Sequence, residues 1–454
     1  MRTVVAIILC AGCGHRDSTD PHNADSDSDT EVPAGPPIVQ FEGSPPRNLL
    51  MLSIDTMRRD HLGLYSELGL TPFLDQLARE GVTLDDHQQC SSWTFDSTTC
   101  TLAGRYNLET DYMPRLGVDH DTYPPVPAGT PFLATALGDA GYHSILVSPN
   151  LFLSEDRGNA QGYDEVYRPT EANDGALNVG TRGIDALLAS VDTSANPWFL
   201  HLHFMEPHST YDPPEEYLVG IDLLDPFPAD LTDKDVLHAY KEDWPNLSPA
   251  EQDLLRSHVE LLYQGEIRAL DDFLRQQWQR LEQEGLLEDT LVVLWTDHGE
   301  QLWSRGEMAH GWALHGEESD AIALFWAHDI LPVRHGEPTS AIDLAPSILQ
   351  AMDLPIPSHM TGLAAGTAPA DRPRYGSCVG LGEIAQSVSQ GSLKLHYQWN
   401  GEVSLYDRAT DPEERIDLYE SRPEEATALW GLLEPQVQIL DDLLGNDGST
   451  PVLP

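Results

Sequence analysis

Continuous apolar runs alternate with amphipathic segments along most of the chain. Residues 48–54 are apolar almost throughout and end at Asp55, and residues 289–296 are similar and end at Asp297. Runs of this length and composition are typical of strands buried on both faces of a parallel sheet. Further strands are expected at 143–148, 197–204 and 321–326.

Helical patterns occupy the segments between these runs. Helices are expected at 71–81, 130–141, 176–191 and 248–285. This alternation predicts an α/β fold with a large, mostly parallel sheet sandwiched by helices. Ligands of such folds bind beyond the carboxyl ends of the strands. Asp55, Asp297 and His298 stand at such positions.

The pattern changes after about residue 364. Short strands are expected at 374–379, 393–399 and 403–406, followed by a helix at 423–444. We therefore predict an α/β domain at 47–364 and a small C-terminal subdomain at 365–454, built from an antiparallel sheet and a helix. Residues 219–246 contain several Pro and Asp and indicate an inserted surface excursion.

The N-terminus has the layout of an export signal. Residues 1–13 carry one positive residue, a short apolar run and small residues before Cys13, which resembles the signal of a bacterial lipoprotein. Residues 14–46 are rich in Asp, Ser, Pro and Gly and predict a disordered acidic linker. We expect an exported protein, periplasmic or at the cell surface, that touches the membrane only through an N-terminal lipid anchor.

The formal charge of −49 excludes some classes of binding partner. The only lysines are Lys234, Lys241 and Lys394. Such an acidic surface repels nucleic acid and anionic lipid, so no nucleic-acid partner is expected. The acidity mainly favours solubility. An anionic substrate would need locally positive groups, and a bound metal ion is the obvious source.

Thr94 precedes a short segment, 96–103, that is expected to form a helix ending at Gly104. A threonine there places its hydroxyl beside free backbone N–H groups, which would hold an anionic oxygen of a substrate. Thr94 is therefore either a nucleophile or an ordinary helix cap. Cys90 and Cys100 flank it, and both a disulfide and two buried thiols remain open.

Asp55, Asp297 and His298 would form a site for one divalent metal ion if they converge on Thr94. The ion would lower the pKa of the hydroxyl and draw charge from a transferred group. Oxygen ligands suit Ca²⁺ or Mg²⁺, and the single imidazole shifts the balance towards Mn²⁺ or Zn²⁺. A single aspartate at a strand end is more often a turn or helix cap.

Two histidines near chain breaks are further candidates. His208 follows the expected strand 197–204, and His310 comes twelve residues after His298. Either could donate a hydrogen bond to the oxyanion of the substrate or protonate the leaving oxygen, although a lone loop histidine usually does neither. The weaker candidates are His315, His201 and His203, of which the last two are expected to face the same side of their strand.

Several motifs together resemble the sulfatase family of the alkaline phosphatase superfamily. They run in the family's order from about Asn48 to Leu418, at residues 53–63, 71–81, 297–300, 343–347 and 405–415. The resemblance implies an α/β domain with a small C-terminal antiparallel sheet. It also implies roles for matching positions: metal ligands at Asp55, Asp297 and His298, a nucleophile at Thr94, and substrate contacts at His208 and His310. Arg58 matches as well, without an assigned role.

The nucleophile segment departs from the family pattern. Sulfatases of this family convert Cys or Ser in a Cys/Ser-x-Pro-x-Arg segment to formylglycine, whereas this chain has Thr94, Asp96 and Thr98 at the Cys/Ser, Pro and Arg positions. Threonine cannot become formylglycine by that route. Thr56 also replaces the second of the usual paired aspartates. Threonine nucleophiles resemble instead the phosphodiesterase, phosphatase and lipoteichoic-acid-synthase branches of the superfamily.

Two functions follow from these observations. The first is a metal-dependent hydrolase, or transferase, of sulfate or phosphate esters with Thr94 as the nucleophile and an anionic ester as substrate. The second is a surface-anchored binding protein on a retired enzyme scaffold, which would hold sulfated or phosphorylated glycans without cleaving them.

Overall fold

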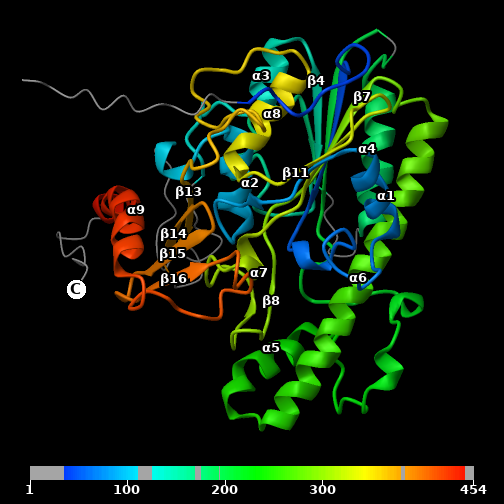
Figure 1. The fold of residues 1–454 in the computed structure, drawn as a ribbon. Coiled ribbons are helices and arrows are strands. Elements are labelled where there is room, and N and C mark those ends of the chain that lie inside the picture. The colour runs from blue at the N-terminus through cyan, green and yellow to red at the C-terminus, as the bar shows by residue number, and fades with distance from the viewer. Residues whose placement is uncertain (1–34, 111–124, 169–174, 194, 380–383, 445–454) are drawn as a thin grey trace, which may run out of the picture. The chain divides into compact units, whose positions relative to one another are not determined.

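The apolar runs form the centre of an eight-stranded sheet. In the computed structural model, which describes residues 35–110, 125–168, 175–193, 195–379 and 384–444, the strand order is β11-β2-β10-β7-β1-β6-β4-β5 (Figure 1). The strands are β1 (Asn48–Ile54), β2 (Val82–Leu84), β4 (His143–Val147), β5 (Glu165–Tyr167), β6 (Trp198–Phe204), β7 (Thr290–Thr296), β10 (Ala323–Trp326) and β11 (Val333–His335).

The sheet is mostly parallel, as predicted. β1 pairs in parallel with both β6 and β7, and β4 pairs in parallel with β5 and β6. β10 runs antiparallel to β7 and β2. The short strands β2, β5 and β11 were not expected, because runs of three residues are too short to show a period.

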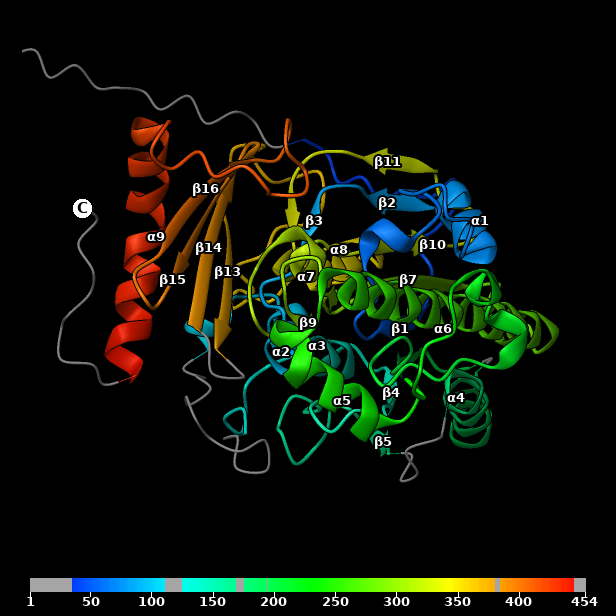
Figure 2. The same ribbon diagram turned by 90° about the horizontal axis from the view of Figure 1, so that it is seen from below.

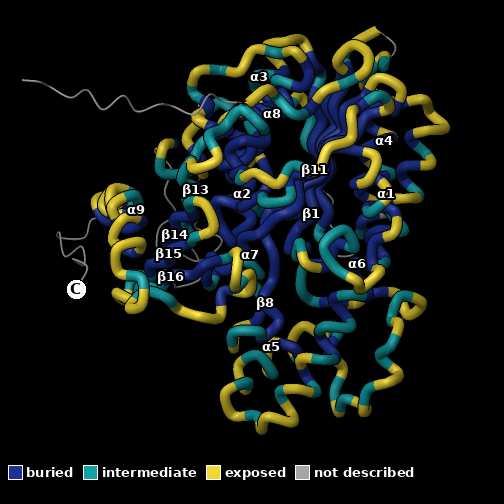
Figure 3. Tube along the Cα trace, viewed as in Figure 1, coloured by how far each residue is buried: buried dark blue, intermediate teal, exposed yellow. Residues whose placement is uncertain are grey.

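Helices cover both faces of the sheet, and the alternate residues of β1 belong to two separate cores. Leu50, Leu52 and Ile54 pack with α1 (Pro72–Glu80), α4 (Ala176–Ser190) and α6 (Pro249–Gln283). Leu49 and Met51 pack on the other face with α2 (Thr94–Ala103), α3 (Leu133–Asp139) and α8 (Leu344–Ala351). Every residue of β1 is buried (Figure 3), which explains its unbroken apolar run.

The longest helix, α6, begins and ends close to the predicted limits. Ser248 caps its first turn by accepting a hydrogen bond from the backbone N–H of Glu251, and Pro249 occupies the first helical position. The Glu251 side chain accepts a hydrogen bond from the Ser248 backbone in return. This reciprocal capping fixes the start of the helix.

The C-terminal region forms a four-stranded antiparallel sheet with a helix packed on it (Figure 2). Its elements are β13 (Arg374–Val379), β14 (Ile384–Gln390), β15 (Leu393–Gln398), β16 (Val403–Asp407) and α9 (Pro423–Leu444). Three of these strands and the helix were predicted. β14 was missed because its Gln and Ser residues hide the apolar pattern. Ala34–Pro454 form one compact unit that includes this sheet.

The predicted disordered linker extends too far. Its residues 38–42 belong to the folded unit: Val39 is buried in the core, the backbone N–H of Ile38 bonds to the carbonyl of Ala365, and Phe41 forms a β-bridge with Ile330. Ile38, Val39 and Phe41 supply apolar surface that the acidic part of the segment lacks. The export signal and the rest of the linker, up to residue 34, lie outside the described residues.

The excursion at 219–246 contains α5 (Lys234–Asp243) and short 3₁₀ turns. Val219 and Leu223 are 60% and 84% exposed, so this part is a surface segment, as predicted (Figure 3). No helix within the described part of the chain has the length and apolar character needed to cross a bilayer.

Candidate active site

The carboxyl ends of β1 and β7 bring two aspartates together. Ile54 lies opposite Thr296 in the parallel register, so Asp55 and Asp297 leave the sheet side by side. His298 follows at once, and all three side chains are fully buried. The Nε2 atom of His298 lies 3.6 Å from Asp55 Oδ1 and 3.6 Å from Asp297 Oδ2. The three predicted metal ligands therefore converge.

Thr94 is the first residue of α2, and its hydroxyl faces this group. The cap residue is Trp93, which makes no side-chain cap, so the interpretation of Thr94 as an ordinary helix cap is wrong. Thr94 Oγ1 lies 3.1 Å from His298 Nε2. α2 ends at Gly104, whose φ of +64° is the left-handed conformation that glycine adopts most easily.

The structure resolves the question left open about the two cysteines near Thr94. Cys90 and Cys100 form a disulfide, with their Cα atoms 6.8 Å apart. The bond ties the segment before α2 to the middle of the helix. It therefore stiffens the turn that presents the Thr94 hydroxyl.

The imidazole of His298 has the state required of a metal ligand. Its Nδ1–H donates to the carbonyl of Gly299 at 2.9 Å, which leaves the lone pair on Nε2, towards Thr94 and the aspartates. Burial and the neighbouring charge of His310 lower its pKa to about 3, so the ring is neutral at physiological pH.

Each aspartate has one bonded and one unpartnered oxygen. Asp55 Oδ2 accepts from the amide of Asn150 at 2.6 Å, and Asp297 Oδ1 accepts from the backbone N–H groups of Thr56 and His298. Within the described residues, Asp55 Oδ1 and Asp297 Oδ2 are buried without a hydrogen-bond donor. Unpartnered buried carboxylate oxygens are costly and require an explanation.

A divalent cation would explain both of these oxygens. Ligand atoms of Asp55, Asp297 and His298 lie within 4.8 Å of one another. Burial and the charge of Asp55 raise the pKa of Asp297 well above its usual range, because two carboxylates compete for one place. The pKa of Asp55 is lowered despite its burial, chiefly by the contact with His203, whose Nε2 lies 3.4 Å from Asp55 Oδ2. The donor set therefore fits such an ion.

The two further histidines lie beside this group. The rings of His310 and His298 have their centroids 4.3 Å apart, and His208 lies 5.1 Å from His310. His310 Nδ1 donates to Glu300 Oε1 at 3.0 Å. Burial opposes protonation of His310, but the charge of Glu300 and this hydrogen bond outweigh it and raise the pKa of the ring. His310 is therefore suited to carry positive charge beside Thr94.

One of the three weaker candidates also reaches the group. Ser53 Oγ lies 2.9 Å from His201 Nε2 and 2.8 Å from His203 Nδ1, so the two histidines face the same side of β6, as predicted. His203 Nε2 comes within 3.4 Å of Asp55 Oδ2. His201 instead contacts the hydroxyl of Tyr163, and burial lowers its pKa to about 3.

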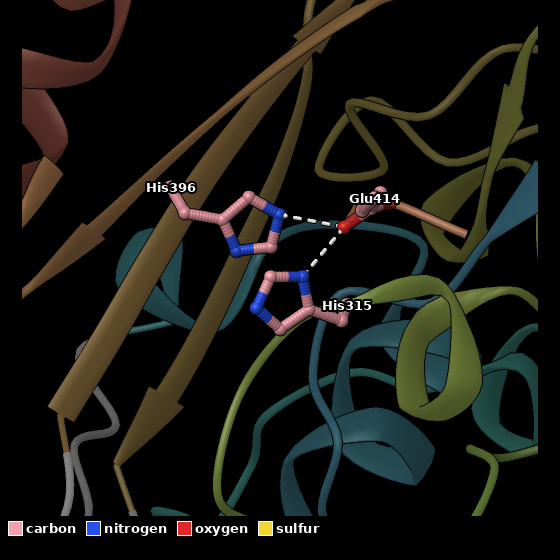
Figure 4. A group of neighbouring side chains, drawn as sticks. All are labelled: His315, His396 and Glu414. Atoms are coloured by element: carbon pink, nitrogen blue, oxygen red, sulfur yellow. Dashed lines mark hydrogen bonds and ion pairs between the residues drawn. The ribbon is translucent and has the colours of Figure 1, made fainter. Parts of the chain in front are cut away.

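Arg58 and His315 are not part of the group. The Nε of Arg58 donates to the carboxylate of Asp60 at 2.9 Å, and its Nη1 donates to the backbone carbonyl of Glu300 at 3.4 Å. Arg58 therefore braces the loop around the site. His315 lies in a second cluster, where His315 Nδ1 and His396 Nε2 donate to Glu414 Oε2 at 2.8 and 3.0 Å (Figure 4).

Sequence reasoning missed two residues of the site. Asn150 binds Asp55, and Glu300 binds His310. Asn150 follows the predicted strand 143–148 by two residues, and that position is the signal that could have identified it. Glu300 lies in the motif that contains Asp297 and His298, so its proximity in sequence was the available signal.

Comparisons with known proteins show the family and the fold of the chain. The model of the sulfatase family matches residues 47–354. The arylsulfatase of Clostridium perfringens (strain 13 / Type A) is 20% identical over 442 residues, which cover 82% of this chain and 90% of that protein.

Two solved structures are similar in fold. One is of a protein in complex with its substrate D-glucosamine-2-N,6-O-disulfate (TM-score 0.67, 17% identity, 90% of this chain and 100% of that one). The other is the phosphonate monoester hydrolase of Silicibacter pomeroyi (TM-score 0.65, 20% identity, 90% and 96%).

The fold and the family match define the class of protein as a hydrolase of the alkaline phosphatase superfamily. Within that class, the chain belongs to the sulfatase family, because the family model covers more than half of its length.

Proposed function

We propose that the protein is a metal-dependent hydrolase of sulfate or phosphate esters in which Thr94 is the nucleophile. The observation that carries this proposal is the pair of buried, unpartnered oxygens, Asp55 Oδ1 and Asp297 Oδ2, close to the Thr94 hydroxyl and His298 Nε2. A retired binding scaffold would have no need to keep two facing carboxylates in this costly arrangement.

Four atoms would hold one divalent cation: Asp55 Oδ1, Asp297 Oδ2, His298 Nε2 and Thr94 Oγ1. When bound, the ion lowers the pKa of the hydroxyl and withdraws charge from the transferred group. The protein supplies the arrangement of these donors. Asn150 fixes the rotamer of Asp55, and two backbone N–H groups fix that of Asp297.

The histidines supply charge and protons around Thr94. The Thr94 hydroxyl loses its proton to solvent, its oxygen forms a bond to sulfur or phosphorus, and the bond from that atom to the ester oxygen breaks. His310, protonated and held by Glu300, donates a hydrogen bond to the anionic oxygens of the transferred group. His208 protonates the departing alcohol. Water then attacks sulfur or phosphorus and gives a proton to the now neutral His208, the bond from that atom to the Thr94 oxygen breaks, and the Thr94 oxygen is protonated again as sulfate or phosphate leaves. Attack by water is needed because Thr94 has no second hydroxyl on the same carbon through which to expel the group.

Sulfated saccharides and phosphate or phosphonate esters are the substrate classes to test. The similar structures include a protein bound to a disulfated glucosamine and a phosphonate monoester hydrolase. The threonine at the nucleophile position excludes formylglycine chemistry and favours phosphoesters, whereas membership of the sulfatase family favours sulfate esters. A panel of aryl sulfates, phosphate monoesters, phosphate diesters and phosphonates under several divalent ions distinguishes them.

The deciding variant is Thr94→Ala, with Thr94→Ser as the matched control. The alanine variant should retain the metal and lose roughly 10³-fold or more in kcat/KM, and the serine variant should recover part of the activity. Undiminished hydrolysis by the alanine variant would rule out Thr94 as the nucleophile. Binding of sulfated saccharides without turnover on any substrate would support the binding protein instead.

The export signal and lipid anchor at residues 1–13 form a second part of the proposal. Their support is the sequence pattern alone. Labelling of the expressed protein with a radioactive fatty acid, compared between Cys13 and Cys13→Ala forms, tests it. Loss of label only in the variant is the expected outcome.

A further inference from the structure

We propose that Lys241 forms a subsite for a second anionic group of the substrate, in addition to the sulfate or phosphate that is transferred. The inference rests on the proposed function, because it concerns the part of the ester that leaves. The residue belongs to α5, within the inserted segment 219–246. The proposed reaction at Thr94 and its metal ligands does not use a lysine at this position.

Contacts of α5 place Lys241 close to the candidate active site. Its ammonium lies 5.0 Å from the centre of the Trp312 ring, and Trp312 is two residues after His310. The charges of Glu300 and Glu307 act on Lys241, and Glu300 is the carboxylate that holds His310. Lys241 therefore lies near His310, the histidine proposed to contact the transferred group.

A second contact holds the end of α5 in place. Trp244, directly after the helix, stacks on Trp303 with ring centroids 4.7 Å apart and an interplanar angle of 13°. Trp303 belongs to the hairpin of β8 (Gln301–Leu302) and β9 (Met308–Ala309), which leads to His310. Figures 1 and 2 show α5 beside this hairpin. The end of α5 that follows Lys241 is thus fixed to the hairpin that leads to His310.

The ammonium of Lys241 makes no ion pair with any of the described residues, although the chain is strongly acidic. The other two lysines differ: Lys394 is buried against Glu414, and Lys234 is exposed at the start of α5. Glu300 is a buried carboxylate whose charge acts on Lys241. It already accepts hydrogen bonds from His310 and Tyr211. A cation that rests on an indole ring has its outer side available to an anion.

The chemistry of such a subsite selects among esters of similar size. A formal charge of −49 repels every anionic substrate, and repulsion grows with each added charge. A cation at the rim offsets that cost only for a molecule with a second negative group within its reach. We therefore expect Lys241 to favour a dianionic sugar ester, such as a disulfated glucosamine, over its singly charged counterpart.

The test compares glucosamine-2-N,6-O-disulfate with N-acetylglucosamine-6-O-sulfate, which differ by one anionic group. Their binding is measured by calorimetry in the Thr94→Ala background, which removes turnover, and their kcat/KM values are measured with Thr94 present. Lys241→Gln should reduce the preference for the disulfate about fivefold or more, Lys241→Glu should reduce it further, and Lys241→Arg should preserve it. The control Lys234→Gln changes a lysine on the same helix and should leave the preference unchanged.

An unchanged preference in Lys241→Gln, or no preference for the disulfate in the protein with Lys241, would overturn the inference. An equal loss of affinity for both sugars would also overturn it, because it would show a structural role. Failure of the proposed function looks different, since metal-loaded protein with intact Thr94 would then turn over none of the esters. The calorimetric comparison still decides the role of Lys241 in that case.

Discussion

Two buried groups of histidines and carboxylates that could hold a metal ion occur among the described residues, and they differ in their balance of charge. At the ends of β1 and β7, two aspartates face each other and each keeps an unpartnered oxygen. At the C-terminal sheet, one glutamate, Glu414, meets His315 and His396 on one oxygen (Figure 4). Its other oxygen meets Lys394 and Arg408. Both groups are buried, and both consist of histidines and carboxylates.

This difference separates a candidate metal site from a structural cluster. Glu414 is already surrounded by cations and N–H donors, so a metal ion would have to displace them and approach two positive charges. Asp55 and Asp297 make no such pair with a lysine or arginine within the described residues: each keeps one oxygen without a donor, and burial and the charge of Asp55 raise the pKa of Asp297. Buried carboxylates are stable only when paired or bound to a cation. The surplus of negative charge is thus the informative feature.

The most direct way to break this comparison is Asp297→Asn. It removes the charge of one carboxylate, so the protein should lose its divalent ion and roughly 10³-fold or more of its kcat/KM. Glu414→Gln should retain the ion. Elemental analysis of both purified variants, together with their ester hydrolysis, checks this outcome. Metal retained by Asp297→Asn and lost from Glu414→Gln would reverse the assignment of the two groups.

Glu414→Gln should act on stability instead. It leaves Lys394 buried without its carboxylate partner, whereas Arg408 keeps Asp320 and Asp86, and breaking a buried ion pair typically costs about 3–5 kcal/mol. Chemical denaturation should show this loss in the free energy of unfolding. The neighbouring Glu413 has a side chain that is 77% exposed, so Glu413→Gln is the matched control and should change stability little. Equal stability of the two variants would contradict the structural role.

Asn150→Ala sharpens the comparison at the candidate metal site. The amide of Asn150 orients Asp55, and loss of an orienting partner typically weakens metal affinity about 10- to 100-fold. Titration of the metal-free protein with Mn²⁺ or Ca²⁺ measures the change. Asn246→Ala removes an exposed amide that bonds to Asp243 and to none of the metal ligands, so it should leave the affinity as it is. An unchanged affinity in Asn150→Ala would show that Asp55 needs no such support.

Acid should act on the Glu414 cluster through His396. Burial and the charge of His315 lower the pKa of His396 from 6.5 to about 3 in the folded protein. A lowered folded pKa means that stability is fully present above pH 6.5 and is lost as the pH falls from 6.5 towards 3. This group adds a slope of up to about 1.4 kcal/mol per pH unit. Denaturation at several pH values should show a shallower slope for His396→Gln, and an equal slope would contradict this account.

Much of the fold followed from sequence because its strongest signals are long. The apolar runs ending at Asp55 and Asp297 mark strands buried on both faces, and the capped amphipathic stretch at 249–283 marks a helix. Sequence placed both aspartates at the ends of strands, but only the structure shows that these two strands are neighbours and that the carboxylates therefore meet. The three-residue strands and β14 could not be found in this way, because their register depends on neighbours distant in sequence.

The orientation and contacts of the side chains in the candidate site were harder to predict from the sequence. Sequence could not show that the Thr94 hydroxyl turns towards His298 and leaves the cap position to Trp93, since that orientation depends on packing. It also could not distinguish His203, which reaches Asp55, from His201, which reaches Tyr163. Both histidines share one face of β6, and only the neighbouring strands make them different.

The pairing of β1 with β7 has a consequence for how this protein could diversify. Because Ile54 lies opposite Thr296, the two aspartates are held by the backbone ladder of the sheet, where a shift of one residue would turn every side chain to the other face. The loops at the rim take no part in that ladder. Insertions there can lengthen, shorten or change charge, and so alter which molecules enter, while the spacing of the central carboxylates is inherited unchanged.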